Sequence, residues 1–429
     1  MTDTVGLAAY RMAAHAAGPA LRLTLRRRLA AGKEDPARLP ERRGVPGAAR
    51  PEGRLVWLHG ASVGESLSVL PLIEALSERE PGARFLVTTG TVTSAALMAE
   101  RLPPRAIHQY APLDQPGYVA RFLSHWRPDA GLFVESELWP CLIREARRRG
   151  VPLALVNGRI SPRSFARWRK RPKAARALLD GFDVLLAQDP ANAERLETLA
   201  GRAVPTTGNL KHAAPALPVD ARALHLLTEA VMGRPAWLAA STHAGEEEDV
   251  LAAHAQVAER LPGTLTIIAP RHPSRGDAVA EMLEAAGLPY ARRAAGALPG
   301  PGDAVYLADT LGELGLFYRL SDVTFVGGSL SGTGGHNPLE PARLGCAIVT
   351  GPDLFNFADI YGRMRAAGGA AIVRNARDLA ASLLRLLSDP MTRDEMAARA
   401  QGWSDEAAAA VLSDVLDALA PVLSADAHR

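Results

Sequence analysis

Cysteine is scarce in this chain. Only two cysteines, Cys141 and Cys346, occur among 429 residues. This number rules out a disulfide framework and a zinc site built on cysteine, and it is natural for a protein of a reducing compartment. With 48% hydrophobic residues, the chain is long enough for two domains of ordinary size, each with its own core.

Several familiar catalytic and cofactor motifs are also missing. No G-x-G-x-x-G follows an apolar run, and no Walker A sequence is present. The patterns G-x-S-x-G and H-E-x-x-H are absent as well. These absences argue against a nicotinamide or P-loop enzyme.

Long hydrophobic runs are lacking too. Near the beginning, the longest uncharged piece is Met12–Leu21, which is too short to span a bilayer. No convincing cleavage site of a secretory signal follows it. The segment is therefore either an amphipathic anchor lying in the membrane plane or an ordinary first helix packed on its domain. We favour the anchor, because a group of arginines suited to anionic headgroups follows the run: Arg22, Arg26, Arg27 and Arg28.

Positive charge is concentrated in two places, although the net charge is only +3. Residues 1–50 contain ten Arg or Lys against four Asp or Glu, a difference of +6. The segment Arg159–Arg176 has eight basic residues and no acidic one. Such patches suit an anionic membrane surface or a nucleic acid, or are simply solvated. We expect a membrane surface on the cytoplasmic side, and no nucleic acid.

Apolar runs of strand length alternate with helical patterns along most of the chain. The expected strands are 55–59, 84–90, 129–136, 152–158, 182–188, 236–242, 264–270, 304–309, 323–328 and 347–351. This alternation predicts an α/β protein with two Rossmann-like domains facing each other across a cleft. The expected parts are a membrane-associating segment 1–40, a domain 41–212, a linker 213–220, a domain 221–400 and a final helix 401–429 that returns to the first domain.

Ligands of such folds bind at the carboxyl ends of the strands, where the polar motifs of this chain are found. In HGASVGE, Glu65 stands where the first strand turns into a helix. It suits a helix start, where the dipole favours a carboxylate, or a catalytic base. Glu135 and Glu137 end another strand, and period two sends both side chains to one side. There they either cap the next helix or bind a cation or a hydroxyl-rich ligand.

The second half contains a glycine-rich loop that leads into a helix expected near Asn337–Pro338. Exposed backbone N–H groups and a helix start together suit a phosphate. Glu340, one turn further on, suits ribose hydroxyls, and Arg271 suits the same phosphate. The pattern predicts a site for a nucleoside monophosphate. The alternative is that the glycine-rich loop is a turn without a ligand.

At these motifs the chain resembles the 3-deoxy-D-manno-octulosonic acid (Kdo) transferases of Gram-negative bacteria, which have the GT-B fold. The resemblance runs from about residue 40 to about residue 360, and its motifs are WLHGASVGE, TTGTVTSA, VESELWP, LVNGRIS, GNLK, STHAGEEE, APRHPSR, DTLGELGLFY and FVGGSL with GGHNPLEPA. The beginning departs from the family, whose members often start with a longer and more continuous apolar anchor.

The resemblance implies transfer of Kdo from CMP-Kdo to the lipid A precursor, with inversion at the sugar and without a metal or another cofactor. It implies that Glu65 is the catalytic base. It also implies that the protein lies at the cytoplasmic face of the inner membrane. The implied CMP-binding residues are Arg271, Gly312, Glu313, Leu314, Asn337 and Glu340. The implied acceptor-binding residues are Ser62, Gly64, Glu135, Glu137 and Lys211.

Two other functions remain open from the sequence. A different GT-B enzyme, such as a nucleotide-sugar epimerase, would need no lipid acceptor, and the basic beginning would have no use. A non-enzymatic module that binds a membrane surface would not need so many hydroxyl and carboxylate groups at strand ends.

Overall fold

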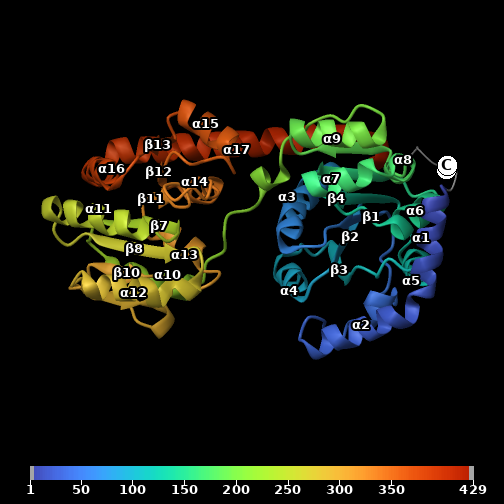
Figure 1. Cartoon of the computed structure of the whole chain (residues 1–429), viewed down its shortest axis with the longest axis horizontal. Coiled ribbons are helices and arrows are strands. Elements are labelled where there is room, and N and C mark those ends of the chain that lie inside the picture. The colour runs from blue at the N-terminus through green and yellow to red at the C-terminus, as the bar shows by residue number, and fades with distance from the viewer. Residues whose placement is uncertain (1–3, 425–429) are drawn as a thin grey trace. The chain divides into compact units, whose positions relative to one another are not determined.

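Parallel strands form two separate sheets in the computed structural model, which describes residues 4–424 (Figure 1). One compact unit comprises the chain up to Pro215 together with the stretch from Ala408 onward, and the other comprises Ala216–Ala407. In each unit, helices connect strands that pair in parallel, which is the Rossmann-like arrangement. The predicted α/β class with two parallel sheets is confirmed.

Within the described residues, the sheet of the first unit has six strands in the order β3-β2-β1-β4-β5-β6. Its strands are β1 Leu55–His59, β2 Arg84–Thr89, β3 Ala106–Tyr110, β4 Ala130–Val134, β5 Leu153–Gly158 and β6 Val184–Ala187. The helices of this unit are α1 Val5–Ala16, α2 Gly18–Ala30, α3 Val63–Arg79, α4 Val92–Arg101, α5 Pro116–Trp126, α6 Pro140–Arg148, α7 Pro162–Arg169, α8 Pro172–Leu179 and α9 Pro190–Ala200, with short 3₁₀ turns η1 Leu39–Arg43 and η2 Leu210–Ala213.

The sheet of the second unit has seven strands in the part of the chain that is described, in the order β13-β12-β11-β7-β8-β10-β9. They are β7 Ala236–Thr242, β8 Leu265–Pro270, β9 Tyr290–Arg292, β10 Val305–Leu307, β11 Val323–Val326, β12 Ala347–Thr350 and β13 Ala370–Ile372. The helices are α10 Ala221–Val231, α11 Glu246–Arg260, α12 Gly276–Ala285, α13 Leu314–Arg319, α14 Leu339–Arg343, α15 Ala358–Ala366 and α16 Ala376–Ser388, with 3₁₀ turns η3 Pro273–Arg275 and η4 Arg293–Ala295. The long α17 Pro390–Ala418 and the short α18 Ala420–Leu423 end the chain.

Both faces of each sheet are buried, and successive residues of a strand point to opposite faces. In β1, Leu55 and Trp57 join one core cluster while Val56 and Leu58 join another. The C-terminal end of α17 covers the second of these clusters, together with α18. Val415 of α17 and Val422 of α18 pack there. The burial on both faces explains why the strands appear in the sequence as continuous apolar runs.

Helices α1 and α2 lie at one side of the first unit, where α1 runs beside α5 and α6 (Figure 1). Only Leu7 in α1 and Leu25 in α2 are buried, although α1 is rich in apolar residues. Among residues 4–424, no helix combines the length and the hydropathy that a bilayer crossing requires.

Three strands were not predicted, namely β3, β9 and β13, and all of them lie at sheet edges. An edge strand is short or partly polar because one side lacks a neighbour, so its apolar signal is weak. The predicted strand 129–136 ends earlier than expected, at Val134, because Glu135 adopts a left-handed backbone with φ 60°.

Candidate active site

The loop between β1 and α3 holds Glu65 by a reciprocal pair of hydrogen bonds. Ser62 caps α3, and its Oγ accepts the N–H of Glu65 at 3.3 Å. The Oε2 atom of Glu65 accepts the N–H groups of Ala61 at 2.5 Å and of Ser62 at 3.3 Å. This is a capping box, which fixes the side chain at the helix start. The carboxylate therefore has a structural role at the helix start whether or not it also acts as a base.

The surroundings of Glu65 raise its pKa despite these hydrogen bonds. Burial is the main cause, since only 8% of the residue is exposed. The negative charge of Glu137, and to a smaller extent that of Glu135, raises the pKa further, while the N–H groups of Ala61 and Ser62 lower it. A carboxylate whose pKa is raised is a stronger proton acceptor than an ordinary glutamate.

Glu135 and Glu137 lie near Glu65, but the alternation of a strand does not place them there. The predicted strand through residue 136 was wrong, because β4 ends at Val134, so strand alternation is not the reason that both carboxylates lie near Glu65. Glu135 instead turns with a left-handed backbone, a conformation that non-glycine residues rarely adopt. Both carboxylates are buried, and each raises the pKa of Glu65.

Each of these two carboxylates meets a different group. The Nζ atom of Lys211 lies 2.7 Å from Oε1 of Glu135. Nε2 of His59 lies 3.4 Å from Oε2 of Glu137, and the indole of Trp139 donates to the same oxygen. Burial raises the pKa of Glu137, but His59 and Trp139 outweigh it, so the net shift of its pKa is downward. Glu137 is therefore an anion that faces Glu65.

The other residues assigned to the acceptor lie at the same end of the sheet. Ser62 and Gly64 are exposed at the start of α3. A Cβ at Gly64 would come within 3.9 Å of Nζ of Lys211, so the glycine and the ammonium are neighbours. The predicted residues Ser62, Gly64, Glu65, Glu135, Glu137 and Lys211 are thus close together in one unit.

If Glu65 is the base, its raised pKa predicts how activity depends on pH. A base works only when deprotonated, so kcat/KM is expected to fall as the pH drops through this raised value, above the range of an ordinary glutamate. Replacing Glu137 by Gln removes one negative charge, and it should move this acid limb to lower pH. A pH–rate profile of both proteins tests this, and an acid limb that stays in place after Glu137→Gln would contradict it.

In the second unit, the glycine-rich loop after β11 is organised by a buried carboxylate. Glu246, at the first turn of α11, has no exposed surface. Its Oε2 accepts the N–H groups of His243 at 3.0 Å and Gly328 at 2.7 Å, and its Oε1 accepts those of Ser329 and Leu330, both at 2.8 Å. Three of the loop amides that the sequence suggested for a phosphate therefore bind this internal carboxylate, and that part of the prediction was wrong.

The helix after this loop is shorter and later than expected. It is α14, which has five residues and begins at Leu339 rather than near Asn337–Pro338. Asn337 turns the chain into it, because its Oδ1 accepts the N–H of Leu339 at 3.1 Å. Its Nδ2 donates to Oε1 of Glu340 at 3.3 Å. Burial raises the pKa of Glu340, while Asn337 and the charge of Arg271 lower it.

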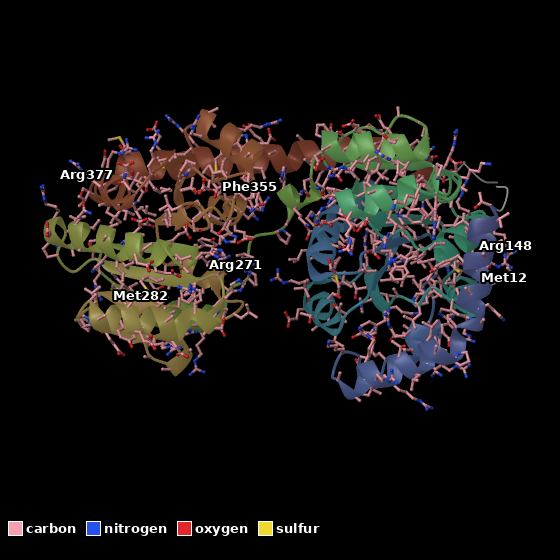
Figure 2. The ribbon with its side chains drawn as sticks, viewed as in Figure 1. Met12, Arg148, Arg271, Met282, Phe355 and Arg377 are labelled. Carbon is pink, nitrogen blue, oxygen red and sulfur yellow. The ribbon has the colours of Figure 1, made fainter. Side chains whose placement is uncertain are left out.

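Arg271 follows β8, as predicted, and its side chain is exposed (Figure 2). Its charge influences Glu340, His243 and His336, so these groups are its neighbours within the second unit. The two imidazoles lie with their Nε2 atoms 2.8 Å apart. Burial, together with His243 and Arg271, lowers the pKa of His336 to about 4, so this ring is neutral at physiological pH.

Gly312, Glu313 and Leu314 were predicted to contact CMP, and Glu313 is bound by other residues of the second unit. Glu313 accepts two hydrogen bonds from Arg293, at 2.5 and 3.0 Å, and one from Thr310 at 2.5 Å. Arg293 is the main cause that lowers the pKa of Glu313. Gly312 has a left-handed backbone with φ 85°, and Leu314 begins α13.

The sequence did not identify the roles of His59, His243, His336 and Glu246. The signal for Glu246 was present, because a run of acidic residues opens a helix directly after a glycine. Nothing in the sequence, however, pairs residue 246 with amides more than eighty positions away. Within residues 4–424, no three His, Cys, Asp or Glu side chains are grouped so that they could hold a metal ion.

Comparison with solved structures defines the class of the fold. A glycosyltransferase from Rickettsia africae matches with a TM-score of 0.57 and 11% identity, over 88% of this chain and all of that one (100%). UDP-GlcNAc 2-epimerase from Neisseria meningitidis matches with a TM-score of 0.55 and 14% identity, over 86% of this chain and 99% of that one. The chain thus has the GT-B-like fold that glycosyltransferases share with such epimerases.

Sequence comparison then gives the family. Residues 37–214 match the family model described as 3-deoxy-D-manno-octulosonic-acid transferase (kdotransferase). The 3-deoxy-D-manno-octulosonic acid transferase of Bordetella pertussis is 38% identical over 428 residues, which cover 97% of this chain and 99% of that protein. The corresponding transferase of Haemophilus influenzae is 34% identical, over 84% and 85% of the two chains. The chain belongs to the 3-deoxy-D-manno-octulosonic acid transferase family.

Proposed function

We propose that the protein transfers Kdo from CMP-Kdo to a hydroxyl of the lipid A precursor, with inversion at the sugar, and that Glu65 is the base. The observation that supports this most is the environment of Glu65, whose pKa is raised by burial and by two neighbouring carboxylates. Membership of the transferase family supplies the donor and the class of reaction.

In this reaction the acceptor hydroxyl attacks C2 of Kdo while the bond between C2 and the phosphate oxygen breaks. The hydroxyl proton passes to Glu65, and CMP leaves with the electron pair of the broken bond. Positive charge develops on the sugar as the leaving group departs, so the reaction depends on electrostatic stabilisation as well as on the base. In our proposal the negative charges of Glu137 and Glu135 raise the pKa of Glu65 and so make it a stronger proton acceptor. Arg271 stabilises the departing phosphate.

Arg271 is expected to act mainly on donor binding. It is exposed, and its charge lowers the pKa of Glu340, which is assigned to the same CMP site, so a donor phosphate has access to it. Arg271→Ala is expected to raise KM for CMP-Kdo about 10- to 100-fold, the loss of one charge-assisted contact. Steady-state kinetics with varied donor measure it.

Arg260→Ala, at an exposed position of the same unit, is the control and should leave the donor KM unchanged. An Arg271→Ala protein with the donor KM of the parent would remove Arg271 from the site.

The position at the membrane also belongs to this proposal. The basic beginning and the segment Arg159–Arg176 would attract the protein to anionic headgroups, where the acceptor resides. The mostly exposed apolar residues of α1 suit a helix that lies in the membrane plane on the cytoplasmic side.

One incubation tests the function as a whole. Purified protein is mixed with CMP-Kdo, with and without lipid A precursor, and the products are measured by mass spectrometry. An increase in the mass of the lipid by one or more Kdo residues supports the proposal. A donor that is altered equally without acceptor would indicate an epimerase-like reaction, and lipid binding without CMP release would indicate a binding module.

A further inference from the structure

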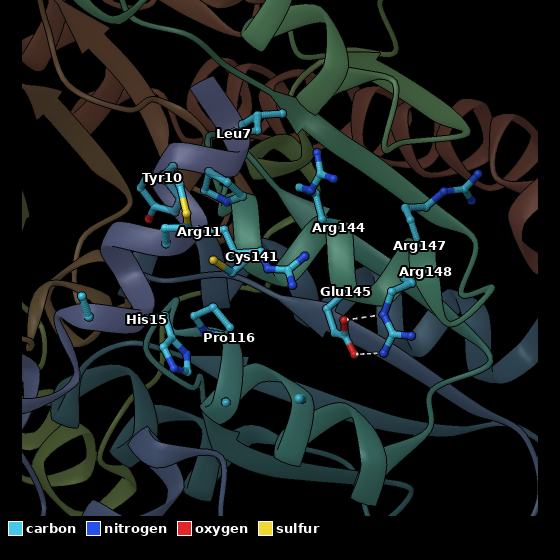
Figure 3. A pocket seen from close by; sticks show the side chains of 15 residues that line it. Leu7, Tyr10, Arg11, His15, Pro116, Cys141, Arg144, Glu145, Arg147 and Arg148 are labelled. Atoms are coloured by element: carbon cyan, nitrogen blue, oxygen red, sulfur yellow. Dashed lines mark hydrogen bonds and ion pairs between the residues drawn. The ribbon is translucent and has the colours of Figure 1, made fainter. Parts of the chain in front are cut away.

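A large hollow lies beside α1 in the first unit, away from the capping box of Glu65. Its volume is about 1210 Å³, and α1, the start of α5 and α6 form its walls (Figure 3). Pockets for small ligands usually measure ~300–1,000 Å³. This hollow therefore has room for a ligand larger than a single sugar.

The lining of this hollow is strongly basic. It contains Arg11, Arg144, Arg147 and Arg148, against one acidic residue, Glu145. Glu145 is bound by Arg148 at 2.7 Å, and hydrogen bonds from Arg148 are the main cause that lowers its pKa to about 2, so it stays charged. Arg147 lies 2.6 Å from Asp183, which is outside the lining and compensates its charge. The lining is still richer in guanidinium groups than in carboxylates, which favours an anionic ligand.

A second hollow, of about 500 Å³, adjoins the first at α1. The two share Leu7, Tyr10 and Pro140 in their linings. The second combines aromatic walls, Trp139 and Trp168, with two exposed arginines, Arg167 and Arg171. Apolar walls next to guanidinium groups match a ligand that is both anionic and apolar.

Helix α1, which contributes to the lining of both hollows, is held in place by a hydrogen bond. The hydroxyl of Tyr10 donates to Asp114 at 3.0 Å, and Asp114 in turn accepts the N–H groups of Cys141 and Leu142 at the start of α6. Val5 and Met12 on the same helix are exposed by 88% and 69%. The helix thus has a fixed position and carries apolar side chains that suit a lipid surface.

Glu137 connects the second hollow with the candidate base. It lines that hollow, and its charge raises the pKa of Glu65. A ligand in the hollow therefore lies against a residue that acts directly on the base. This proximity indicates a subsite of the same reaction rather than an unrelated site.

We infer that the two hollows beside α1 bind the phosphorylated, acylated end of the acceptor glycolipid, which is an anionic and apolar ligand. Its phosphate would bind the arginines, and an acyl chain would lie along Leu7, Trp139 and Trp168. The inference rests on the proposed function, because it takes the acceptor to be such a lipid. It goes further in assigning a site for the part of the acceptor that does not react.

Two double variants of the full chain separate this site from general surface charge. Arg167→Ala/Arg171→Ala removes two arginines from the lining. Arg163→Ala/Lys173→Ala removes two exposed charges from the same basic segment that line neither hollow. Equilibrium binding of lipid A precursor in neutral detergent micelles is measured without CMP-Kdo, and binding to phosphatidylglycerol vesicles is measured in parallel.

The first double variant is expected to lose about tenfold or more in affinity for the micellar acceptor, as for one lost charge-assisted contact. The second should stay within about twofold of the parent, because it loses only screened surface charge. Both should weaken vesicle binding to the same extent. In the parent protein, an acceptor stripped of its acyl chains should bind more weakly than the intact one.

Equal losses of acceptor affinity in the two double variants would overturn the inference and leave only a charged membrane surface. Acceptor affinity unchanged in both would overturn it as well. Because binding is measured without the donor, these outcomes are distinct from failure of the proposed function. That function fails if the parent protein adds no Kdo to the acceptor.

Discussion

Replacing Glu65 by Gln is expected to lower kcat by about 10²–10⁴-fold, the usual contribution of a general base. Glutamine keeps an oxygen that can accept the N–H of Ala61, so the capping box and the loop should survive. What is lost is the ability to take a proton. The KM for CMP-Kdo should change little, since the donor is assigned to the second unit. Single-turnover kinetics at saturating donor and acceptor measure the effect.

Glu74→Gln on the exposed side of α3 is the matched control, because it makes the same change on the same helix. It should retain the turnover of the parent. A Glu65→Gln protein that binds CMP-Kdo and turns over at a near-normal rate would refute the assignment of the base and leave Glu65 with its capping role alone.

Replacing Glu246 by Ala should produce the largest loss of stability in the second unit. The change leaves four N–H groups without their acceptor, those of His243, Gly328, Ser329 and Leu330. An unpaired buried donor costs about 1–3 kcal/mol. Partial access of water to the loop should reduce the total, so we expect a loss on the order of 3–5 kcal/mol. Urea unfolding of the parent and the variant measures it.

Glu246→Gln should lie between the parent and Glu246→Ala, because one of its two terminal atoms still accepts. Glu248→Ala, two positions along the same helix and exposed, should be close to neutral. Equal unfolding free energies for Glu246→Ala and Glu248→Ala would show that the loop keeps its conformation without the carboxylate.

The sheets illustrate how far prediction from the sequence reached. Central strands such as β1 and β7 were predicted with correct bounds, because a strand buried on both faces is apolar throughout. The edge strands β3, β9 and β13 were missed, because an edge gives a shorter and more polar pattern. The end of β4 was misplaced, because the left-handed backbone of Glu135 leaves no mark in a pattern of apolar residues.

In the candidate site, too, some features were predictable from the sequence and others were not. The positions of Glu65 at a helix start and of Arg271 directly after a strand followed from the alternation of apolar runs and helices, together with the resemblance to a family. That Glu137 and Glu135 raise the pKa of Glu65 did not follow, because it depends on distances between loops of different strands. The same holds for the pair of His243 and His336, which are 93 positions apart in the chain.

The sequence by itself determined the α/β class, the central strands and the membership of a transferase family, because periodicity and local motifs are recorded in neighbouring residues. Only the tertiary structure decided what the polar groups do. It assigned three amides of the glycine-rich loop to Glu246, and it made Glu65 both a member of the capping box of α3 and a carboxylate with a raised pKa. It also formed two hollows lined by arginines beside α1. Charge, burial and hydrogen bonding act through space, and residues far apart in the chain supply them.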